Sequence, residues 1–327
     1  MLAAEGTAMD LRQLRYFAKV VESGSFTKAA NQLHVAQPAL SQHVRHMEEE
    51  LGVSLLHRAA SGVKATEAGQ RLMVHAGRIL AEFAAINDSV RGEAIAPRGL
   101  VRFGLPGTVS EQMAAPLIEA AKIRYPEISI RIVEAMSGYI LEWLKRGDVD
   151  LAMIYSTSDP RGLVVHHVLS EELCLFCSLP MAADTGHAGR TISLADAAAL
   201  PLVVPGPEHG LRQLIDDVAL AQQISISPAI EIDSYSQIKK LVVRGLGFGI
   251  LPRMAVQRED MEGIFRVWRF EPQISRKVYL AYSADRSLSK APRAIAQLSW
   301  EIMRQLVRES IWTAELSHER NSPKLFG

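Results

Sequence analysis

One short segment, QPALSQHVR, carries side chains that can recognise the edges of DNA bases. Its polar members recur at intervals of four, one and three residues: Gln37, Ser41, Gln42 and Arg45. On a helix this spacing places them on one stripe. In the major groove, amide side chains pair with adenine and guanidinium groups pair with guanine, and Pro38 is compact enough to let the backbone approach. The stripe predicts sequence readout, although on an unsupported helix the same residues would be only a solvated polar face.

Basic residues around this segment are the candidates for contacts with DNA phosphates. Lys28 precedes it, and Arg58 and Lys64 follow it in a hairpin-like stretch. Phosphate contacts orient a protein on the duplex without reading its sequence. Residues 9–66 contain seven lysines and arginines against five acidic residues, a surplus of two positive charges. Because this surplus is small, we expect one copy to bind double-stranded DNA weakly and two copies to act across a dyad.

A second group of candidates consists of polar or small residues near expected helix starts later in the chain. Thr108 and Ser110 in GLPGTVSE, and Ser137 and Gly138 in EAMSGY, stand where a strand end opens an expected helix. His209, in GPEHG, and Tyr235 are further candidates from the second lobe, expected to face the same cleft. Helix N-termini present free N–H donors and partial positive charge, so we expect a small polar or anionic metabolite to bind there. Plain helix capping needs the same residue types and stays open as the alternative.

Three further motifs predict no chemistry. Cys174 and Cys177 have the spacing of a redox or metal pair. They lie in an apolar, strand-like run, however, where residues three apart point to opposite faces. GLGFG resembles a phosphate loop, yet ILP follows where a phosphate-binding helix would begin, which favours a tight helix-to-strand turn. The N-terminal histidines have no carboxylate partner at a useful spacing, so we predict no catalytic residue, metal, cofactor or enzyme activity.

The base-reading candidates need a rigid helix, and the surrounding sequence predicts one. After a first helical pattern, Ser25 can cap a short helix, and the third helix begins near Gln37–Pro38, where proline is tolerated. Two short extended pieces then flank a turn at Ser61–Gly62. The order helix, helix, turn, helix, hairpin predicts a winged helix-turn-helix over residues 9–66, after a flexible extension of residues 1–8.

A long helix is predicted next, over residues 67–96. Its apolar positions alternate steps of four and three: Leu72, Ala76, Ile79, Phe83, Ile86 and Val90. This is the seam spacing of a coiled coil, sustained for fewer than three heptads, and it predicts a linker helix that pairs two subunits. An amphipathic helix that only covers its own domain is the alternative.

Beyond Gly99 the pattern changes to alternating strands and helices. Short apolar runs of strand type are LVRFGL, SIRIVEA, VDLAMIY, LCLFCSL, LPLVVPG, PAIEID, FGILP and KVYLAYS. Helical stretches separate them, two of which begin near Ser110 and Ser137, and a last helix runs from about Ser289 to Glu309. This alternation predicts largely parallel sheets in two α/β lobes. The polar residues 313–327 predict a flexible tail.

The totals fit a multidomain α/β protein of the cytoplasm. A chain of 327 residues exceeds one ordinary core, and 48% hydrophobic residues suffice for several. The 36 basic and 36 acidic residues cancel, so net charge indicates no partner. Two cysteines exclude a disulfide framework. The N-terminus lacks the pattern of a secretory signal, and no run reaches the roughly 18 apolar residues that span a membrane.

The segment LRYFAKVVESGSFTKAANQLHVAQPALSQHVRHMEEELGVSLLHR, followed by TEAG, resembles the DNA-binding domain of LysR-type transcriptional regulators. The later order of elements is also similar to this family, and IRIVEAMSGYILEWLKRGDVDLAMIY resembles its nitrogen-assimilation-control branch. One departure is Ala36, where the family usually has a serine whose hydroxyl can cap the helix.

The resemblance implies a two-lobed Rossmann-like, periplasmic-binding-protein-like effector domain. The second lobe, residues 170–274, would be inserted into the first, residues 97–169 and 275–312, through two crossover strands. Thr108 and Ser137 would occupy inducer-binding positions. The resemblance also implies homotetramers and contact with RNA polymerase.

The sequence therefore predicts a DNA-binding transcription regulator that senses a small molecule. A regulator that binds DNA constitutively, without any ligand, is one alternative. Another is a small-molecule-binding or catalytic α/β protein whose N-terminal helices have no DNA role.

Overall fold

The computed structural model divides the chain into two compact units, each of which is described by itself. The N-terminal unit is Met1–Ile95 with Arg146–Asp148, and the C-terminal unit is Ala96–Lys145 with Val149–Gly327. The structure describes residues 9–59, 62–91, 96–155, 160–183, 189–284 and 288–317.

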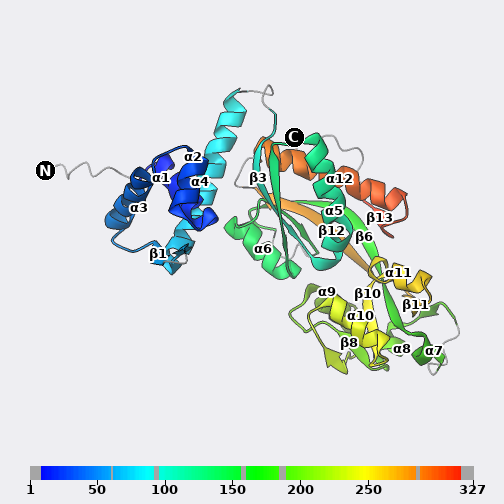
Figure 1. The fold of residues 1–327 in the computed structure, drawn as a ribbon. Helices are drawn as coiled ribbons and strands as arrows, with labels where there is room; N and C mark the ends of the chain where they lie inside the picture. Colours follow the sequence, from blue (N-terminus) through cyan, green and yellow to red (C-terminus); the bar gives the residue numbers. More distant parts are fainter. Residues whose placement is uncertain are drawn as a thin grey trace. The chain divides into compact units, whose positions relative to one another are not determined.

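The N-terminal unit has the predicted order of three helices, a hairpin and a long helix (Figure 1). Its elements are α1 (Leu11–Ser23), α2 (Phe26–Leu33), α3 (Gln37–Leu51), β1 (Leu56–Ala59), β2 (Gly62–Ala65) and α4 (Glu67–Arg91). Asp10 starts α1 because its carboxylate accepts the Gln13 N–H at 2.7 Å. Ser25 caps α2, whereas Ala36 leaves α3 without a side-chain cap, as its sequence implies. The winged helix-turn-helix prediction is confirmed; Ser61 of the predicted turn lies outside the described residues.

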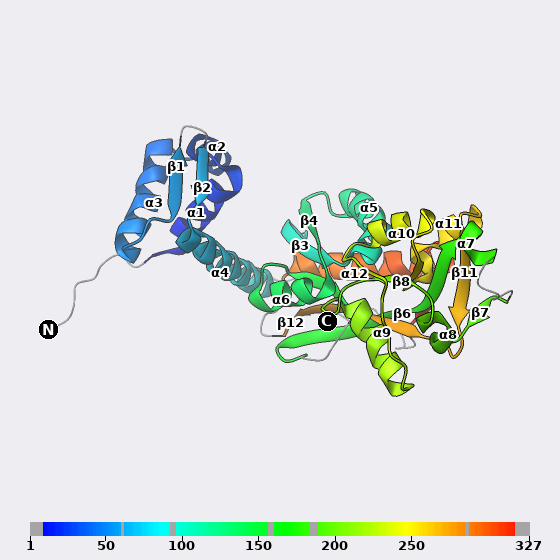
Figure 2. The ribbon, with the colours of Figure 1, turned by 90° about the horizontal axis from the view of Figure 1, so that it is seen from below.

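Two contacts fix the hairpin against the helices. The Val63 N–H donates to the Gly24 carbonyl at 2.9 Å, which ties β2 to the turn between α1 and α2. Gly24 is left-handed, with φ of 63°, which favours glycine at the end of α1. Glu48 on α3 accepts the backbone N–H groups of Leu55 and Leu56 through Oε1, at 2.8 and 3.1 Å. Figure 2 shows the resulting hairpin beside α3.

Helix α4 begins where expected, because Thr66 Oγ1 accepts the Gly69 N–H at 3.0 Å. The predicted extension to residue 96 runs into residues 92–95, outside the described part. Along the predicted seam, Ala76 is buried in the unit's own core. The next three seam positions stay exposed: Ile79 at 44%, Phe83 at 41% and Ile86 at 52%. The side chain of Val90 lies outside the described set.

The C-terminal unit consists of two lobes on one continuous run of strands, in the order β4-β3-β5-β12-β6-β10-β8-β9. The strands of the first lobe are β3 (Gly99–Leu105), β4 (Ile128–Glu134), β5 (Leu151–Ile154) and β12 (Ser275–Ser283). Those of the second are β7 (Thr191–Ile192), β8 (Leu202–Val204), β9 (Ile230–Glu231), β10 (Phe248–Pro252) and β11 (Phe265–Phe270). β3 is parallel to β4 and β5, and β8 is parallel to β9 and β10, as the strand–helix alternation predicts.

Strand β6 (Leu163–Ser178) runs from one lobe into the other (Figure 1). Its first half pairs with β12 and its second half with β10 and β11, all antiparallel. The apolar pattern predicts a strand at 173–179, and the resemblance implies a crossover strand near Val168–Ser170; the observed β6 is one strand that includes both, and it starts earlier because half-buried residues such as His166 and His167 also pair within the first lobe. Strand β11 has no counterpart among the predicted strands.

Helices cover the strands of both lobes. Those of the first lobe are α5 (Gly107–Arg124), α6 (Ser137–Arg146) and α12 (Lys290–Arg308). Those of the second are α7 (Leu179–Ala182), α8 (Leu194–Ala198), α9 (Gly210–Ala221), α10 (Tyr235–Val243), the 3-10 turn η2 (Arg253–Ala255) and α11 (Gln257–Met261). Helix α5 starts three residues before the expected Ser110. Among the described residues, no helix is long and apolar enough to cross a membrane.

The predicted flexible tail, residues 313–327, is wrong for its first part. Strand β13 (Glu315–Leu316) pairs with β6, and the Thr313 hydroxyl donates to Gln257. Trp312, just before it, is completely buried. The polar composition of residues 313–327 gave no indication that the buried Trp312 anchors this segment. Residues 318–327 lie outside the described part.

Candidate functional site

The predicted base-reading stripe lies on the outer face of α3. Gln37, Pro38, Gln42 and Arg45 are exposed and Ser41 is half-buried. The opposite face is fully buried through Leu40, Val44 and Met47. Because the core holds one face of the helix, the polar face points away from the core and is available to a groove about as wide as a helix.

Arg58 differs from the other predicted phosphate contacts because its guanidinium has partners within its own unit. Arg58 Nη2 lies 3.2 Å from Glu48 Oε2, and Nη1 donates to Ser41 Oγ at 3.4 Å. Its guanidinium also lies over the Phe26 ring, 5.0 Å from the centroid. Arg58 therefore joins β1 to α3 and α2 although its side chain is 37% exposed; Lys28 and Lys64 are also exposed.

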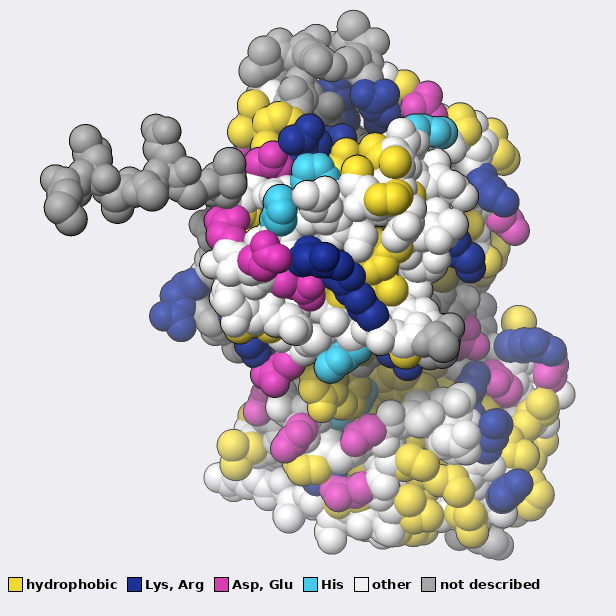
Figure 3. Space-filling model, turned by 60° about the vertical axis from the view of Figure 1, so that its left-hand side comes forward, with side chains coloured by type: hydrophobic (Ala, Val, Ile, Leu, Met, Phe, Trp, Pro, Cys, Tyr) yellow, Lys and Arg dark blue, Asp and Glu magenta, His cyan; other side chains and the backbone are white. Residues whose placement is uncertain are grey.

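Basic side chains do not form one continuous band on the face drawn in Figure 3, where they are interspersed with acidic, histidine and uncharged ones. This distribution agrees with the small surplus of positive charge in the N-terminal sequence.

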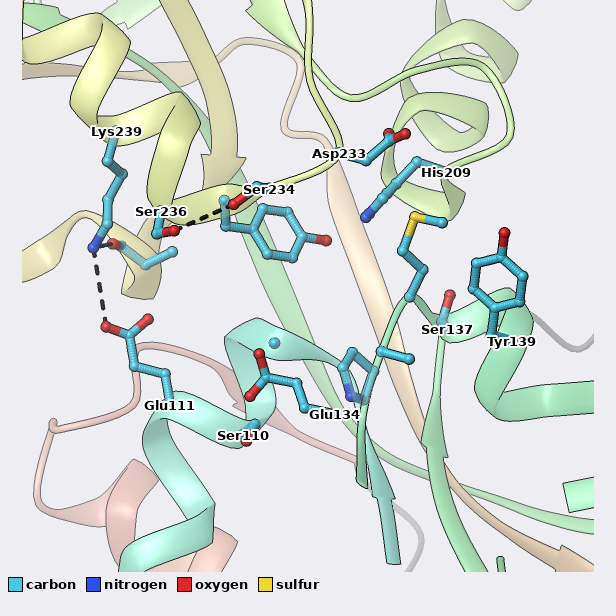
Figure 4. A pocket seen from close by; sticks show the side chains of 16 residues that line it. Ser110, Glu111, Glu134, Ser137, Tyr139, His209, Asp233, Ser234, Ser236 and Lys239 are labelled. Atoms are coloured by element: carbon cyan, nitrogen blue, oxygen red, sulfur yellow. Dashed lines mark hydrogen bonds and ion pairs between the residues drawn. The ribbon is translucent and has the colours of Figure 1, made fainter. Parts of the chain in front are cut away.

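The second site is a cavity of about 710 Å³ between the two lobes of the C-terminal unit. Four helix N-termini reach it, those of α5, α6, α9 and α10 (Figure 4). Of the predicted ligand residues, Ser110, Ser137, His209 and Tyr235 line it. A cavity of this size fits a small metabolite.

Thr108 and Gly138 are not among the lining residues of this cavity. Gly138 has open space on its α-carbon side, with no atom within 4 Å of an added Cβ. Thr108 is buried behind the cavity: its hydroxyl is 2.8 Å from Tyr155 Oη and accepts a hydrogen bond from Arg276 Nη2 at 3.0 Å. Thr108 and Gly138 are the second residues of α5 and α6: the Thr108 side chain is directed away from the cavity, and Gly138 has no side chain to reach it.

A buried network surrounds Arg276, which lies on β12. Its Nε and Nη2 donate to Glu171 Oε2 on β6, at 3.0 and 2.5 Å. The Trp312 indole N–H donates to the other oxygen of Glu171 at 2.9 Å. The guanidinium lies 3.7 Å from the Tyr155 ring centroid. The network thus connects both crossing strands, β5, the start of α5 and the C-terminal segment.

The charged lining of the cavity was not predicted. Glu111, Glu134 and Asp233 contribute carboxylates, and Lys239 contributes an ammonium group. Lys239 Nζ lies 2.8 Å from Glu259 and 4.0 Å from Glu111. Glu134 is the last residue of β4, and Asp233 lies two residues after β9; each is followed within a few residues by a helix. This position between a strand end and a helix start was the signal available in the sequence.

His209 is neutral in this cavity. Its Nδ1 accepts the Leu211 N–H at 3.1 Å, so the ring proton is on Nε2. Burial, together with the positive charge of Arg276, lowers the pKa of His209 to about 4. His209 therefore offers a hydrogen-bond donor without a charge.

The two cysteines lie in the core of β6. Both are fully buried, and burial raises the pKa of each thiol, that of Cys177 to about 12. Cys174 Sγ donates to the Leu251 carbonyl at 3.5 Å. Among the described residues, no group of three histidine, cysteine or acidic side chains could hold a metal ion.

Comparison with known proteins covers both units. Residues 11–70 match the family described as bacterial regulatory helix-turn-helix protein, lysR family, and residues 95–304 match the LysR substrate binding domain. The chain is 32% identical to the nitrogen assimilation regulatory protein nac of Klebsiella aerogenes, over 89% of this chain and 94% of that protein. It is 30% identical to the protein of the same name from Escherichia coli K12, over 92% and 97% of the two chains.

Solved structures of full-length regulators share the fold. OxyR from Pseudomonas aeruginosa aligns with a TM-score of 0.69 at 22% identity, over 90% of this chain and 98% of that chain. BenM aligns with a TM-score of 0.54 at 23% identity, over 96% and 100%. With a matching head, a matching two-lobed domain and relatives aligned along nearly their whole length, the chain belongs to the LysR family of DNA-binding transcriptional regulators with an effector-binding domain.

Proposed function

We propose that this protein binds specific promoter or operator sequences and that a small metabolite in the interlobe cavity changes this binding. The observation that carries the proposal is the coexistence of an outward polar stripe on α3 with a cavity lined by Ser110, Ser137, His209 and Tyr235. A constitutive regulator would need the first feature but not the second.

In DNA binding, we assign base contacts to Gln37, Ser41, Gln42 and Arg45, with Pro38 against the bases. Lys28 and Lys64 contact phosphates. Arg58 keeps this role only through the part of its guanidinium not used by Glu48 and Ser41. Fixed by those contacts, it positions the wing rather than reaching freely for the backbone.

Pairing of two subunits supplies the affinity that one weakly basic head lacks. The exposed Ile79, Phe83 and Ile86 of α4 support this role, because a lone subunit leaves this apolar stripe in water. Homotetramers and a contact with RNA polymerase complete the proposed assembly.

Ligand binding acts as a population shift. A metabolite that binds one arrangement of the two lobes more tightly favours that arrangement, and the spacing of paired heads on DNA changes with it. A ligand with equal affinity for both arrangements would have no effect.

Experiments on the full-length protein test both parts of the proposal, the sequence-specific DNA binding and its change by a metabolite. Selection of bound sequences from a random duplex library should enrich one dyad-symmetric site, and genome-wide mapping should find that site near its target genes. Metabolites that raise the melting temperature should then change the affinity for the selected site. Enrichment without any such metabolite favours the constitutive regulator; no enrichment at all contradicts the DNA-reading role.

A further inference from the structure

We propose that the effector is a zwitterion of the amino-acid type, whose ammonium group binds beside Glu134 and whose carboxylate binds beside Tyr235 and His209. This inference rests on the proposed function, because it assumes that the interlobe cavity is the effector site. It narrows the expected polar or anionic metabolite to one class.

The cavity lining carries an excess of negative charge. Its three carboxylates face one ammonium group, that of Lys239, which already pairs with Glu259. Asp233 accepts the Gly206 N–H at 2.9 Å through Oδ1. Because like charges repel strongly in a partly desolvated site, a metabolite with a net negative charge is disfavoured there.

Glu134 is the carboxylate best placed for a cation. It ends β4, and its side chain makes no hydrogen bond or ion pair with another described residue. Its Oε1 lies 3.4 Å from where a Cβ on Gly107 would be, and the Tyr235 ring lies 3.5 Å from the same point. Figure 4 shows its carboxylate directed into the cavity, below the residues of the second lobe. An ammonium group there would gain a charge-assisted hydrogen bond.

The hydroxyl side of Tyr235 lacks an acceptor, and the Arg276 guanidinium, which does not itself line the cavity, lies close to it. Tyr235 Oη and Arg276 Nη1 are both buried without a hydrogen-bond partner among the described residues. The two groups lie near each other. Burial raises the pKa of Tyr235, and the positive charge of Arg276 partly opposes this rise. Even if Nη1 moved to donate to Oη, the phenol proton would still need an acceptor.

Two more donors lie beside the Tyr235 ring and at the adjoining start of α9. The His209 ring packs edge-on against Tyr235, with centroids 5.3 Å apart, and its Nε2 carries the ring proton. Ser137 Oγ lies 3.1 Å from where a Cβ on Gly210 would be, so it meets the start of α9 from the opposite lobe. A carboxylate satisfies several such donors at once, and the adjacent helix N-termini favour its charge.

The Tyr235 ring therefore separates a donor side from an acceptor side within one cavity. A molecule with only carboxylates leaves Glu134 unpaired and adds negative charge, whereas a molecule with only an amine leaves the lining donors Tyr235, His209 and Ser137 without an acceptor. A zwitterion matches both sides and adds no net charge.

Thermal unfolding and calorimetric titration of the full-length protein test this proposal. The probes are the standard amino acids, β-alanine and γ-aminobutyrate, each compared with the acid that lacks its amine and the amine that lacks its carboxylate. At least one amino acid should raise the melting temperature, and removing either group should weaken binding by about tenfold or more.

Glu134→Gln keeps the shape of the side chain and removes its charge. In this variant the Kd of the amino acid that binds should rise by about tenfold relative to the unchanged protein, and the Kd of the amine-free counterpart should change little. Glu119→Gln, on the exposed outer face of α5, is the matched control and should leave Kd unchanged. The inference is overturned if no amino acid binds, if amine-free acids bind as tightly as their parents, or if Glu134→Gln has no effect.

These outcomes differ from failure of the proposed function. Binding of organic anions alone, with a change in DNA affinity, would refute the zwitterion and leave the metabolite-sensing role intact. If no probe of any class binds, both the zwitterion proposal and the proposed sensing of a metabolite are contradicted. Loss of sequence selection on DNA would instead refute the regulator role and leave the cavity chemistry untouched.

Discussion

Glu48 illustrates, at the scale of single residues, how one carboxylate can serve two elements. One of its oxygens accepts two backbone N–H groups at the entry to the wing, and the other pairs with Arg58. In the sequence it counts as one of five acids that weaken attraction to DNA. In the structure its carboxylate is paired with Arg58 and with two backbone N–H groups, so the surface near α3 is less acidic than the count implies.

Base readout and phosphate binding should separate by mutation. Gln42→Ala should relax base choice at one position, because an amide pair contributes about 1–3 kcal/mol of discrimination. Lys64→Ala should weaken binding to all sequences alike and reduce the salt dependence by about one charge. Quantitative footprinting on matched and mismatched sites measures both. Identical site preferences in the two variants would show that this division of roles is wrong.

Arg58→Ala should behave differently from Lys64→Ala. Besides any loss of DNA affinity, it removes the contacts to Glu48 and Ser41 and should lower the melting temperature of the free protein. The pair is partly exposed, so we expect a loss of no more than about 1 kcal/mol. An unchanged melting temperature would mean that Arg58 has no positioning role.

His209 should make stability depend on pH. Its folded pKa, about 4, lies below the ordinary value of 6.5, so between these values the unfolded chain binds a proton that the folded chain does not. The free energy of unfolding should therefore fall as pH decreases from 6.5 toward 4, by about 3 kcal/mol for this group alone. His209→Asn keeps an acceptor for the Leu211 N–H and removes the titration. Denaturant unfolding of both proteins across this range measures the difference, and parallel curves would contradict the assignment.

At the scale of elements, burial changes along the single helix α4. Its first turns pack on the N-terminal core through Ala76, and its later apolar positions remain exposed. The four-three spacing predicts the stripe, and the structure shows where burial within the unit ends. The partner that covers Ile79, Phe83 and Ile86 is proposed to be a second copy of the same helix.

Ile79→Asp should disrupt this pairing. An unpaired carboxylate in a buried apolar seam costs several kcal/mol, enough to turn a micromolar dimer into a monomer, by about a hundredfold or more in the dissociation constant. Sedimentation equilibrium measures the mass in solution. Gln70→Asp, an exposed position on the opposite side of α4, adds the same charge and should leave the mass unchanged. Equal masses for both variants would remove α4 from the dimer contact.

At the scale of the whole molecule, the buried Arg276–Glu171 pair joins segments that are far apart in the chain. It lies where β6 and β12 pass between the lobes, and Trp312 fixes the C-terminal segment to it. Any change in lobe arrangement acts on the strands that carry this pair. The network is therefore well placed to hold the effector domain in a defined geometry.

Glu171→Gln should destabilise the C-terminal unit strongly, by about 3–5 kcal/mol, because it leaves the Arg276 charge buried without its partner. Trp312→Phe should cost less, about 1–3 kcal/mol, through one lost hydrogen bond to a charged group. Glu172→Gln is the neighbouring control: it loses a pair with the half-exposed Arg269 and should cost at most about 1 kcal/mol. Chemical unfolding measures all three, and a Glu171→Gln cost no larger than the control's would refute this role.

Local features of the sequence predicted most of the elements. Ser25, Gly24 and Thr66 mark helix ends through hydrogen bonds within a few residues, so their effect is legible without a fold. Strand β11 and the anchoring by Trp312 were missed for the opposite reason. Their apolar side chains have partners in β6 and around Glu171, which the surrounding residues do not reveal.

The site shows the same division. The sequence by itself determined that the segments near Ser110 and Ser137 open helices and which stripe of α3 faces outward, because helix periodicity and capping act over a few residues. Only the tertiary structure decided that Thr108 bonds to Arg276, 168 positions later, while Ser137 and Glu134 face the cavity. Such contacts depend on how distant strands are brought together. Burial, charge and hydrogen-bond partners, and with them the ligand chemistry, follow from that arrangement.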